Sequence, residues 1–264
     1  MSSQITFDDG AAYEDYMGVW SRLVGEAFLD WLAPAPGKRW LDVGCGNGAF
    51  TEMIADRCAP SGLLGIDPSP AQLDFARTRP ALHGAQFRQA DAMALPFDDD
   101  AIDAAVMPLV IFFVPDPAKG VAEMARVVAP GGVVTAYAWD MAGGGFPYAA
   151  LLRELRAMGV DVPTPPSADA SRLDVLRALW TGAMLESVDT NEITVQRTFA
   201  SFDDYWATVR KGPSVGKPLK AMGTDAYAQL AERLRALLPA DASGRLTLSA
   251  RANAVRGTVP TRPN

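Results

Sequence analysis

Short apolar runs alternate with amphipathic segments over the first two-thirds of this chain, and no other feature restricts the fold as strongly. Such alternation is typical of strand–helix units built around a mostly parallel sheet. With 264 residues, the chain is long enough for one large α/β domain. We therefore predict an α/β protein whose loops present ligand-binding groups at the ends of the strands.

Seven segments are expected to form strands. Five lie in the first part of the chain, at 39–43, 62–66, 86–89, 101–107 and 133–138. Two later segments, 192–199 and 245–254, carry β-branched residues in partial alternation. We expect these two to complete the same sheet as a terminal hairpin-like pair.

Helical spacing is predicted between and beyond the strands. The expected helices cover 13–32, 49–59, 70–79, 117–128, 147–158, 202–210 and 225–238. Asp116 and Pro117 act as an N-terminal cap and a first-turn proline, and Ala-Pro-Gly-Gly at 129–132 is expected to end that helix and turn into the next strand. Lys211, Lys217 and Lys220 are expected in a mobile loop or a solvated connector.

Composition excludes several classes of function. His83 is the one histidine, so mechanisms that need two imidazoles, such as most histidine-bound zinc or iron centres, are excluded and no metal is expected. The formal charge of -7 offers no global attraction to nucleic acid or anionic lipid. Cys45 and Cys58 are too few for a disulfide framework, and the N-terminus lacks a signal peptide's features. The apolar run 104–114 is too short to span a membrane, so we expect a cytoplasmic protein without membrane insertion.

Three alternate glycines follow the first expected strand directly, in the segment Leu-Asp-Val-Gly-Cys-Gly-Asn-Gly at 41–48. Glycine permits positive φ angles and lets a ligand approach the backbone. Gly44, Gly46 and Ala49 also satisfy the GxGxxG/A dinucleotide fingerprint, so the loop alone leaves the ligand open. A tight turn without a ligand is the alternative, although three glycines are more than a turn needs.

Three aspartates accompany the expected strand ends. Asp67 lies where a carboxylate can accept both hydroxyls of a ribose, or it caps the helix that begins at Ser69-Pro70. Asp42 precedes the glycines, where a negative charge disfavours a pyrophosphate and favours a ligand with an ammonium group. Asp91 follows the third strand, where it can accept a hydrogen bond from an adenine amino group or stay solvated.

Together these motifs resemble the class I, Rossmann-like S-adenosylmethionine-dependent methyltransferases, in particular the small-molecule group of ubiquinone and menaquinone biosynthesis methyltransferases (methyltransferase type 11). The matching segments are LDVGCGNG at 41–48, GIDPS at 65–69, DAMALPFDD at 91–99 and VPDPAKGVAEMARVVAPGG at 114–132. The resemblance implies a seven-stranded, mostly parallel sheet with helices on both faces, an antiparallel last strand and a helical cap. It also implies S-adenosylmethionine as cofactor and S-adenosylhomocysteine as product.

The resemblance further implies the residues of a cofactor site. Gly44, Gly46 and Gly48 line the cofactor, Asp67 holds the ribose, and Asp42 supports the glycine loop or the ammonium group. Asp91 and Ala92 meet the adenine, and Met107 lies near the methionine moiety. Cys45, Pro68 and Ser69 complete this set.

An aromatic-rich stretch ahead of the first strand fits a lid over such a site. Arg22 could pair with the cofactor carboxylate, and Tyr16 or Trp20 could face the sulfonium. Ordinary helix packing is the alternative for these aromatic residues. The domain prediction is a single methyltransferase domain over 1–264. Its parts are a lid (1–35), a cofactor-binding core (36–140), a cap with one strand (141–224) and a C-terminal helix and strand (225–264).

Methyl transfer from a sulfonium needs little covalent help, because the donor is already activated and the protein aligns the acceptor and excludes water. No catalytic residue is therefore assigned. If the acceptor loses a proton, Asp140 and Tyr148 are the base candidates, whereas His83 is expected in an exposed loop.

The segment after the fourth strand limits the acceptor. It reads Met-Pro-Leu-Val at 107–110 and departs from the Asn/Asp-Pro-Pro-Tyr/Phe motif of amide-methylating relatives, so an exocyclic amine of DNA is not expected as acceptor. Residues 111–114, with Trp139, Phe146 and Tyr148, could form apolar walls or pack in the core.

We therefore predict methylation, at oxygen or carbon, of a small apolar or aromatic metabolite. The alternatives are an NAD(P)-dependent Rossmann oxidoreductase, which Asp42 opposes, and a catalytically inactive S-adenosylmethionine-binding protein.

Overall fold

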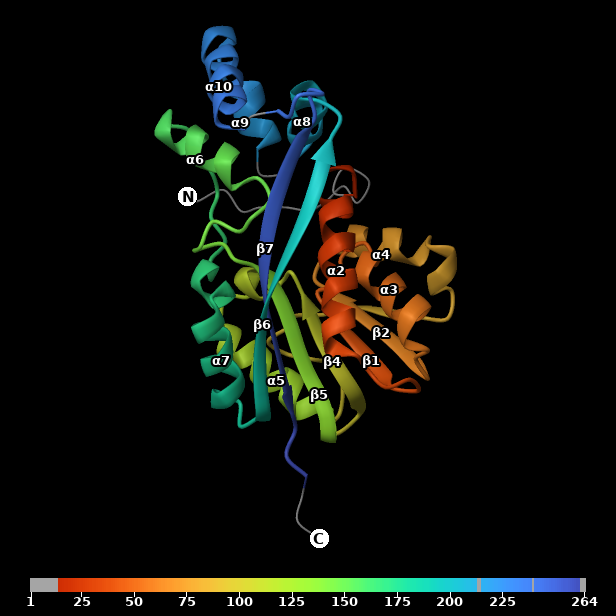
Figure 1. Ribbon diagram of the computed structural model, residues 1–264. Helices are drawn as coiled ribbons and strands as arrows, with labels where there is room; N and C mark the ends of the chain where they lie inside the picture. The colour runs from red at the N-terminus through yellow and green to blue at the C-terminus, as the bar shows by residue number, and fades with distance from the viewer. Residues whose placement is uncertain (1–13, 213–214, 239, 262–264) are drawn as a thin grey trace.

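A seven-stranded sheet forms the centre of the computed structural model, which describes residues 14–212, 215–238 and 240–261 (Figure 1). The strands are β1 (Arg39–Val43), β2 (Gly62–Asp67), β3 (Gln86–Gln89), β4 (Ile102–Pro108), β5 (Val128–Trp139), β6 (Glu186–Phe199) and β7 (Leu246–Thr258). Their order is β3-β2-β1-β4-β5-β7-β6. The pairs among β1 to β5 are parallel, and β7 lies antiparallel between β5 and β6. The predicted mostly parallel sheet with an antiparallel last strand is confirmed.

Helices cover both faces of this sheet. They are α2 (Val19–Leu32), α3 (Ala49–Cys58), α4 (Pro70–Arg77), α5 (Pro117–Val127), α6 (Ala149–Ala157), α7 (Leu173–Gly182), α8 (Phe202–Val209), α9 (Gly216–Ala221) and α10 (Thr224–Leu237). Short single turns are η1 (Glu14–Gly18), η2 (Pro80–Leu82), η3 (Ile111–Phe113) and η4 (Ala168–Ser171). None of these described helices is long and apolar enough to cross a membrane.

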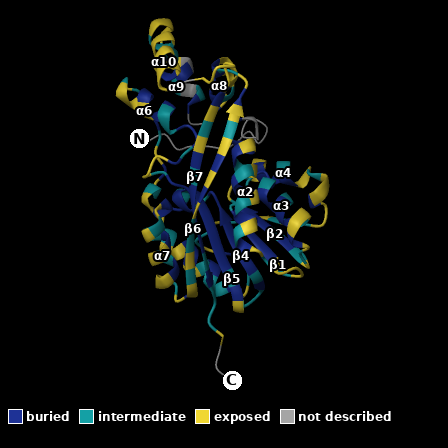
Figure 2. Cartoon of the chain, viewed as in Figure 1, coloured by how far each residue is buried: buried dark blue, intermediate teal, exposed yellow. Residues whose placement is uncertain are grey.

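Two adjacent residues of β7 define the two covered faces. The Arg256 guanidinium lies 4.8 Å from the ring centroid of Trp31 on α2, whereas a Cβ built on Gly257 would lie 2.9 Å from Trp180 on α7. Since successive residues of a strand point to opposite faces, α2 and α7 cover opposite sides of the sheet. Figure 2 shows the buried residues concentrated on the strands between these layers.

Helix α2 is part of the hydrophobic core. The ring of Phe28 lies 4.5 Å from Tyr137 on β5 and 6.0 Å from Phe50 on α3. Such aromatic contacts bury large apolar areas and fix the helix on the sheet. The predicted aromatic-rich helix over 13–32 is found as η1 and α2, with Tyr13 outside the described residues.

Local start signals place the helices as predicted. The Asp116 side chain accepts a hydrogen bond from the Lys119 amide at 3.1 Å, and Pro117 occupies the first turn of α5. The predicted turn over 129–132 is wrong in one respect. Helix α5 ends at Val127, but β5 begins at once, and Gly131 takes a φ of +79° inside the strand.

The later strands are longer than predicted, and two helices were not expected. β6 begins at Glu186 and β7 ends at Thr258. The added residues are held by pairing between the two strands, and at this sheet edge they show little alternation of apolar and polar residues. Helix α7 was not predicted within 141–187. Helix α9 occupies part of the predicted Lys211–Lys220 loop or connector.

A helical cap, formed by α6, α8, α9 and α10, lies beyond the extended ends of β6 and β7 (Figure 1). Buried Glu154 on α6 accepts hydrogen bonds from Arg233 on α10 at 2.6 and 2.8 Å. Arg235 on α10 in turn pairs with Asp203 at 2.9 Å on α8. These ion pairs join α6, α8 and α10 to one another, and α10 lies in this cap although it was predicted in the separate C-terminal segment 225–264.

Candidate functional site

The glycine loop at the end of β1 is a tight turn with a glycine-dependent backbone. Gly44, Gly46 and Gly48 have φ angles of +75°, +51° and +80°. The amides of Gly44 and Cys45 both donate to the carbonyl of Ile66 at 2.8 Å, which ties the loop to β2. Only glycine adopts these angles without strain, so the turn itself requires all three glycines.

The three glycines differ in what surrounds them. A Cβ built on Gly44 would lie 2.6 Å from Val110, and one on Gly48 would lie 2.8 Å from Leu82. On Gly46 it would meet one atom alone, the Gln72 side-chain oxygen at 3.9 Å. Gly44 and Gly48 therefore also permit close packing, and Gly46 leaves the space in which a ligand can approach the backbone.

Asp67 lies directly against this open glycine. One carboxylate oxygen accepts a hydrogen bond from the Gly46 amide at 3.0 Å, and the other accepts from the Ser69 amide at 2.8 Å. Burial raises the pKa of Asp67. Helix α4 is capped by Ser69, whose hydroxyl accepts from the Gln72 amide at 3.4 Å, so the alternative that Asp67 caps this helix is wrong. A carboxylate oxygen accepts more than one hydrogen bond, so Asp67 can still receive ribose hydroxyls.

Asp42 is completely buried beneath the loop. One carboxylate oxygen accepts a hydrogen bond from the Thr51 hydroxyl at 2.7 Å, and the other has no partner among the residues that the structure describes. Burial, with a smaller contribution from Asp67, raises the pKa of Asp42 to about 7. An unpaired buried carboxylate oxygen is costly, which favours a cationic or hydrogen-bond-donating ligand nearby.

Cys45 is an unreactive member of the loop. Burial and the charges of Asp42 and Asp67 raise the pKa of its thiol well above the usual range. Because the thiolate is the nucleophilic form, this side chain does not support thiol chemistry.

The ends of β2 and β3 meet on the other side of Asp67. The Gln89 amide group donates to the Pro68 carbonyl at 3.0 Å, and the Ala90 amide donates to the Asp67 carbonyl at 3.3 Å. The next residue, Asp91, is exposed, and its carboxylate accepts from the Met93 amide at 2.8 Å. Asp91 and half-buried Ala92 therefore lie at the strand end next to Asp67. A ligand whose ribose lies at Asp67 would place its adenine near these two residues.

The side chain of Met107 is not brought to the loop. It is fully buried, and its terminal methyl lies 3.7 Å from a Cβ built on Gly120 of α5. The side chain therefore packs between β4 and α5. The predicted place of Met107 near the methionine moiety stays a prediction, and only the backbone of this residue could meet the ligand there.

Tyr16 and Trp20 lie together in an aromatic cluster, and Arg22 does not join them. The Tyr148 hydroxyl donates to the Tyr16 carbonyl at 2.7 Å and accepts from the Trp20 indole at 3.1 Å. The rings of Tyr16 and Tyr148 stack at 4.5 Å. Arg22 is exposed on the outer side of α2, four residues before exposed Glu26. This packing accounts for the two aromatic residues, and the lid stays a prediction.

Neither predicted base candidate has the environment of a base. Asp140 is held by the Arg251 guanidinium, with Nε at 3.1 Å, and it accepts from the Gly143 amide at 2.8 Å. Burial raises the pKa of Tyr148 to about 12, so its hydroxyl keeps its proton at neutral pH. His83 is exposed, as predicted.

Removing the Tyr148 hydroxyl should affect stability rather than chemistry. Tyr148→Phe removes the hydrogen bond that the buried Trp20 N–H donates to the Tyr148 hydroxyl, so we expect a loss of about 1–3 kcal/mol in the free energy of unfolding. Urea denaturation measures this change. Tyr227→Phe, which removes a longer 3.2 Å hydrogen bond to exposed Arg210, is the control. Unchanged stability with a lost methyl-transfer rate would make Tyr148 a reacting group.

The loop after β4 holds a residue that sequence reasoning missed. Leu109 has a φ of +59°, a strained conformation for a leucine, and its amide donates to the Tyr137 carbonyl at 2.7 Å. This conformation places Val110 against Gly44. Pro108 alone indicated a special loop, and no sequence signal indicated the left-handed leucine.

Comparison with known proteins finds a family match over part of the chain. Residues 41–136 match the family described as a methyltransferase domain. Malonyl-[acyl-carrier protein] O-methyltransferase of Serratia marcescens is 34% identical over 128 residues, which are 48% of this chain and 49% of that protein. 2-Methyl-6-phytyl-1,4-hydroquinone methyltransferase 2 of Oryza sativa subsp. japonica is 41% identical over 95 residues, 36% of this chain and 27% of that protein. The chain thus spans about half or less of the length of these curated relatives.

A solved structure extends the similarity beyond the matched segment. Phosphoethanolamine N-methyltransferase 2 of Haemonchus contortus, in complex with S-adenosyl-L-methionine, aligns with a TM-score of 0.61 at 17% identity. The alignment covers 97% of this chain and 58% of that one, and because the identity is low it shows the fold alone. The matched segment contains the glycine loop, Asp67 and Asp91, so residues 41–136 are similar to a methyltransferase domain, and the chain as a whole shares the fold of a solved S-adenosylmethionine-dependent methyltransferase.

Proposed function

We propose that this chain transfers a methyl group from S-adenosylmethionine to a small molecule. The observation that carries the proposal is the 3.0 Å hydrogen bond from the Gly46 amide to Asp67, at the member of the three loop glycines that has open space beside it. A carboxylate fixed beside an open backbone loop can accept hydrogen bonds from the ribose hydroxyls while the methionine part of the cofactor lies over the glycines.

The residues present fit this cofactor. Asp42 has an unpaired, buried oxygen below the loop, which could accept the ammonium group directly or through water. Asp67 and Asp91 lie on neighbouring strand ends for the ribose and the adenine. When bound, the cofactor supplies a methyl group on a cationic sulfur, whose C–S bond breaks with its electron pair left on sulfur while an acceptor lone pair forms the new bond.

The protein's part in that reaction is to orient the acceptor and exclude water. The buried aromatic cluster of Tyr16, Trp20 and Tyr148 contacts Tyr205 of cap helix α8 and would exclude water from an acceptor bound against it. A carboxylate acceptor has no proton to lose, whereas a hydroxyl or carbon acceptor releases a proton to solvent or to a base.

The strand order opposes the oxidoreductase alternative. Dinucleotide-binding Rossmann sheets have the order 3-2-1-4-5-6. Here β7 is inserted antiparallel between β5 and β6. The charge of buried Asp42 beside the glycine loop also disfavours a pyrophosphate.

We further propose a small apolar or aromatic acceptor, methylated at oxygen or carbon, and a cytoplasmic location. One relative is named as an O-methyltransferase, which supports methylation at oxygen, and another as a hydroquinone methyltransferase, which supports an aromatic acceptor. Cys45 and Cys58 are both buried and free, in keeping with a reducing compartment. The net charge of -7 disfavours nucleic acid as a partner.

Isothermal titration tests the cofactor first. We expect S-adenosylhomocysteine to bind with micromolar affinity and NAD not to bind, and Asp67→Ala to weaken S-adenosylhomocysteine at least tenfold. Asp67→Asn keeps the shape of the side chain and covers the case in which alanine disturbs the loop. Asp56→Ala, which removes an exposed carboxylate on α3, is the matched control. Binding of NAD without binding of S-adenosylhomocysteine would contradict the proposal.

Turnover separates an enzyme from an inactive binding protein. Radiolabelled methyl transfer into a metabolite extract should proceed with the unmodified chain and fail with Asp67→Ala. Tight cofactor binding without any transfer would favour the inactive S-adenosylmethionine-binding protein.

A further inference from the structure

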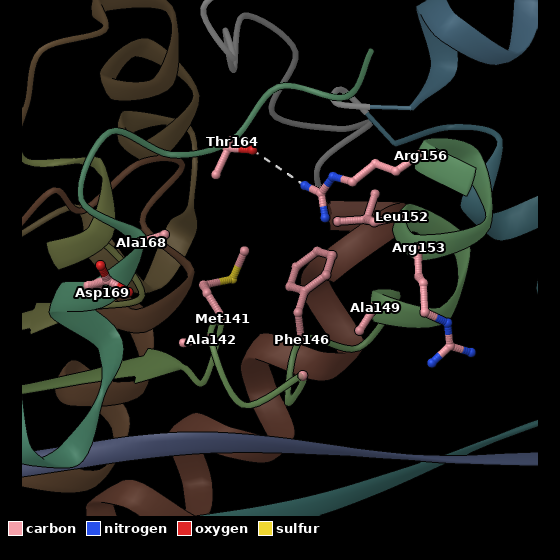
Figure 3. A pocket seen from close by; sticks show the side chains of 11 residues that line it. Met141, Ala142, Phe146, Ala149, Leu152, Arg153, Arg156, Thr164, Ala168 and Asp169 are labelled. Carbon is pink, nitrogen blue, oxygen red and sulfur yellow. Dashed lines mark hydrogen bonds between the residues drawn. The ribbon is translucent and has the colours of Figure 1, made fainter. Parts of the chain in front are cut away.

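A pocket of about 330 Å³ lies between the loop that follows β5 and helix α6 (Figure 3). Its lining comprises Met141, Ala142, Gly144, Phe146, Ala149, Leu152, Arg153, Arg156, Thr164, Ala168 and Asp169. Figure 3 shows the side chains of Met141 and Phe146 pointing toward the side of the pocket on which Arg156 reaches from α6 to Thr164. Its volume and its apolar floor are those of a small-molecule pocket.

The cations of this pocket are incompletely neutralised. Arg156 donates to the Thr164 hydroxyl at a long 3.4 Å, and no carboxylate pairs with it in the described part of the chain. Arg153 lies 3.7 Å from Glu154, but Arg233 holds that carboxylate at 2.6 Å. Arg156 therefore leaves positive charge at the pocket, and Arg153, whose guanidinium points away from Arg156 in Figure 3, adds positive charge at its edge.

The one carboxylate of the lining does not cancel this charge. Asp169 is exposed on the far wall, where Figure 3 places it away from Arg153 and Arg156. Its charge acts on Arg172, a cation outside the lining. A bidentate guanidinium contact with a carboxylate or phosphate is the strongest use of an unpaired arginine, so the pocket favours an anionic ligand.

The pocket shares a wall with the loop that borders the glycines. The amide and hydroxyl of Ser167 donate to the carbonyls of Phe112 and Val114 at 3.0 and 2.8 Å, and the Ser171 hydroxyl accepts from the Met141 amide at 3.1 Å. Strands β1, β4 and β5 are neighbours, so roughly 10 Å, two strand spacings, separate the ends of β1 and β5. A ligand in the pocket lies on the β5 side of the glycine loop.

We propose that this pocket holds the methyl acceptor and that the acceptor is an amphipathic anion. Its apolar part rests on Met141, Phe146 and Leu152, and its carboxylate or phosphate pairs with Arg156, with Arg153 at the edge. The inference rests on the proposed function, and it narrows the acceptor from any apolar metabolite to one with a negative charge.

Ligand-observed NMR with S-adenosylhomocysteine present tests the recognition. The probes are 4-phenylbutyrate, 3-phenylpropyl phosphate and the neutral 4-phenylbutanamide. We expect both anions to bind in the millimolar range and the amide at least fivefold more weakly; the anion that binds better identifies the headgroup. Arg153→Gln/Arg156→Gln should weaken the anions at least tenfold, and Phe146→Ala should weaken all three probes. Arg77→Gln, which removes one positive charge from the distant helix α4, should change none.

The outcomes for the pocket and for the cofactor are separable. S-adenosylhomocysteine titration reports the proposed function alone, since neither arginine lies in the cofactor site. If the cofactor product binds but the double variant binds the anions as tightly as the unmodified chain, the pocket proposal is overturned. A metabolite extract, fractionated on an anion exchanger before the reaction, should accept methyl groups in its retained fraction. The double variant should raise KM there with little change in kcat, and acceptance confined to the unretained fraction would overturn the proposal.

Discussion

Gly44→Ala is expected to weaken S-adenosylhomocysteine binding at least 100-fold. Alanine at a φ of +75° costs about 1–2 kcal/mol, and its Cβ would lie 2.6 Å from a methyl of Val110, which adds an overpacking cost of about 1–3 kcal/mol. Both costs are relieved if the loop moves away from its position beside Asp67, and that movement destroys the ligand geometry. Titration gives the affinity, and urea denaturation gives the stability.

Two further variants separate these costs. Gly37→Ala introduces the same left-handed strain, at a φ of +78°, but a Cβ there meets nothing within 4 Å. Val110→Ala, combined with Gly44→Ala, removes the overlap and keeps the strain, so the double variant should recover about 1–3 kcal/mol of stability. If Gly44→Ala costs no more stability than Gly37→Ala, contact with Val110 does not hold the loop in place.

Elements with strong local signals could be predicted from the sequence. β1 was predicted with its observed ends, because an apolar run is followed at once by the glycine loop. Helix α5 begins where Asp116 and Pro117 predict. Edge strand β6 was predicted too short, because its first residues are held by pairing with β7, as between Asp189 and Arg256, and not by apolar alternation.

Helix α7 shows a different reason for failure. Leu176 and Trp180 are both fully buried and lie four residues apart, so the helical signal was present. The Pro-rich loop before it hid this signal, and the region was assigned to the cap without a helix. The Trp180 indole donates to the Val134 carbonyl at 2.8 Å, a contact that depends on the finished sheet.

The residues of the candidate site also differ in whether the sequence alone could indicate their environment. Asp42, Asp67 and the glycines could be identified because their chemistry lies within short segments at strand ends. The environment of Asp140 could not, since its partner Arg251 lies 111 residues away, and the partner of Tyr148 in η1 lies 132 residues away. Such long-range pairs are set by the fold, and they turned two base candidates into structural groups.

The buried carboxylate of Asp42 should make stability and ligand affinity respond to pH in opposite directions. In the folded chain its pKa is about 7, above the unfolded value of 3.8. The folded state therefore binds more protons between these values, and the contribution of Asp42 to stability falls as pH rises from about 4 to 7 and then stays constant. Asp42→Asn removes this dependence. The free energy of unfolding of Asp42→Asn minus that of the unmodified chain should therefore be larger at pH 8 than at pH 5, by on the order of 3 kcal/mol.

Affinity should follow the opposite course. An ionised Asp42 attracts the ammonium group of S-adenosylhomocysteine, so binding to the unmodified chain should tighten from pH 6 to pH 8, whereas binding to Asp42→Asn should be weaker and nearly flat over this range. Thr51→Val provides a graded control. The Thr51 hydroxyl bond lowers the pKa of Asp42, so its loss should move both transitions to higher pH. Urea denaturation and titration calorimetry at pH 5, 6, 7 and 8 measure these curves. Parallel curves for the unmodified chain and Asp42→Asn would mean that Asp42 does not titrate in this range, and its unpaired oxygen would then serve the glycine loop rather than the ligand.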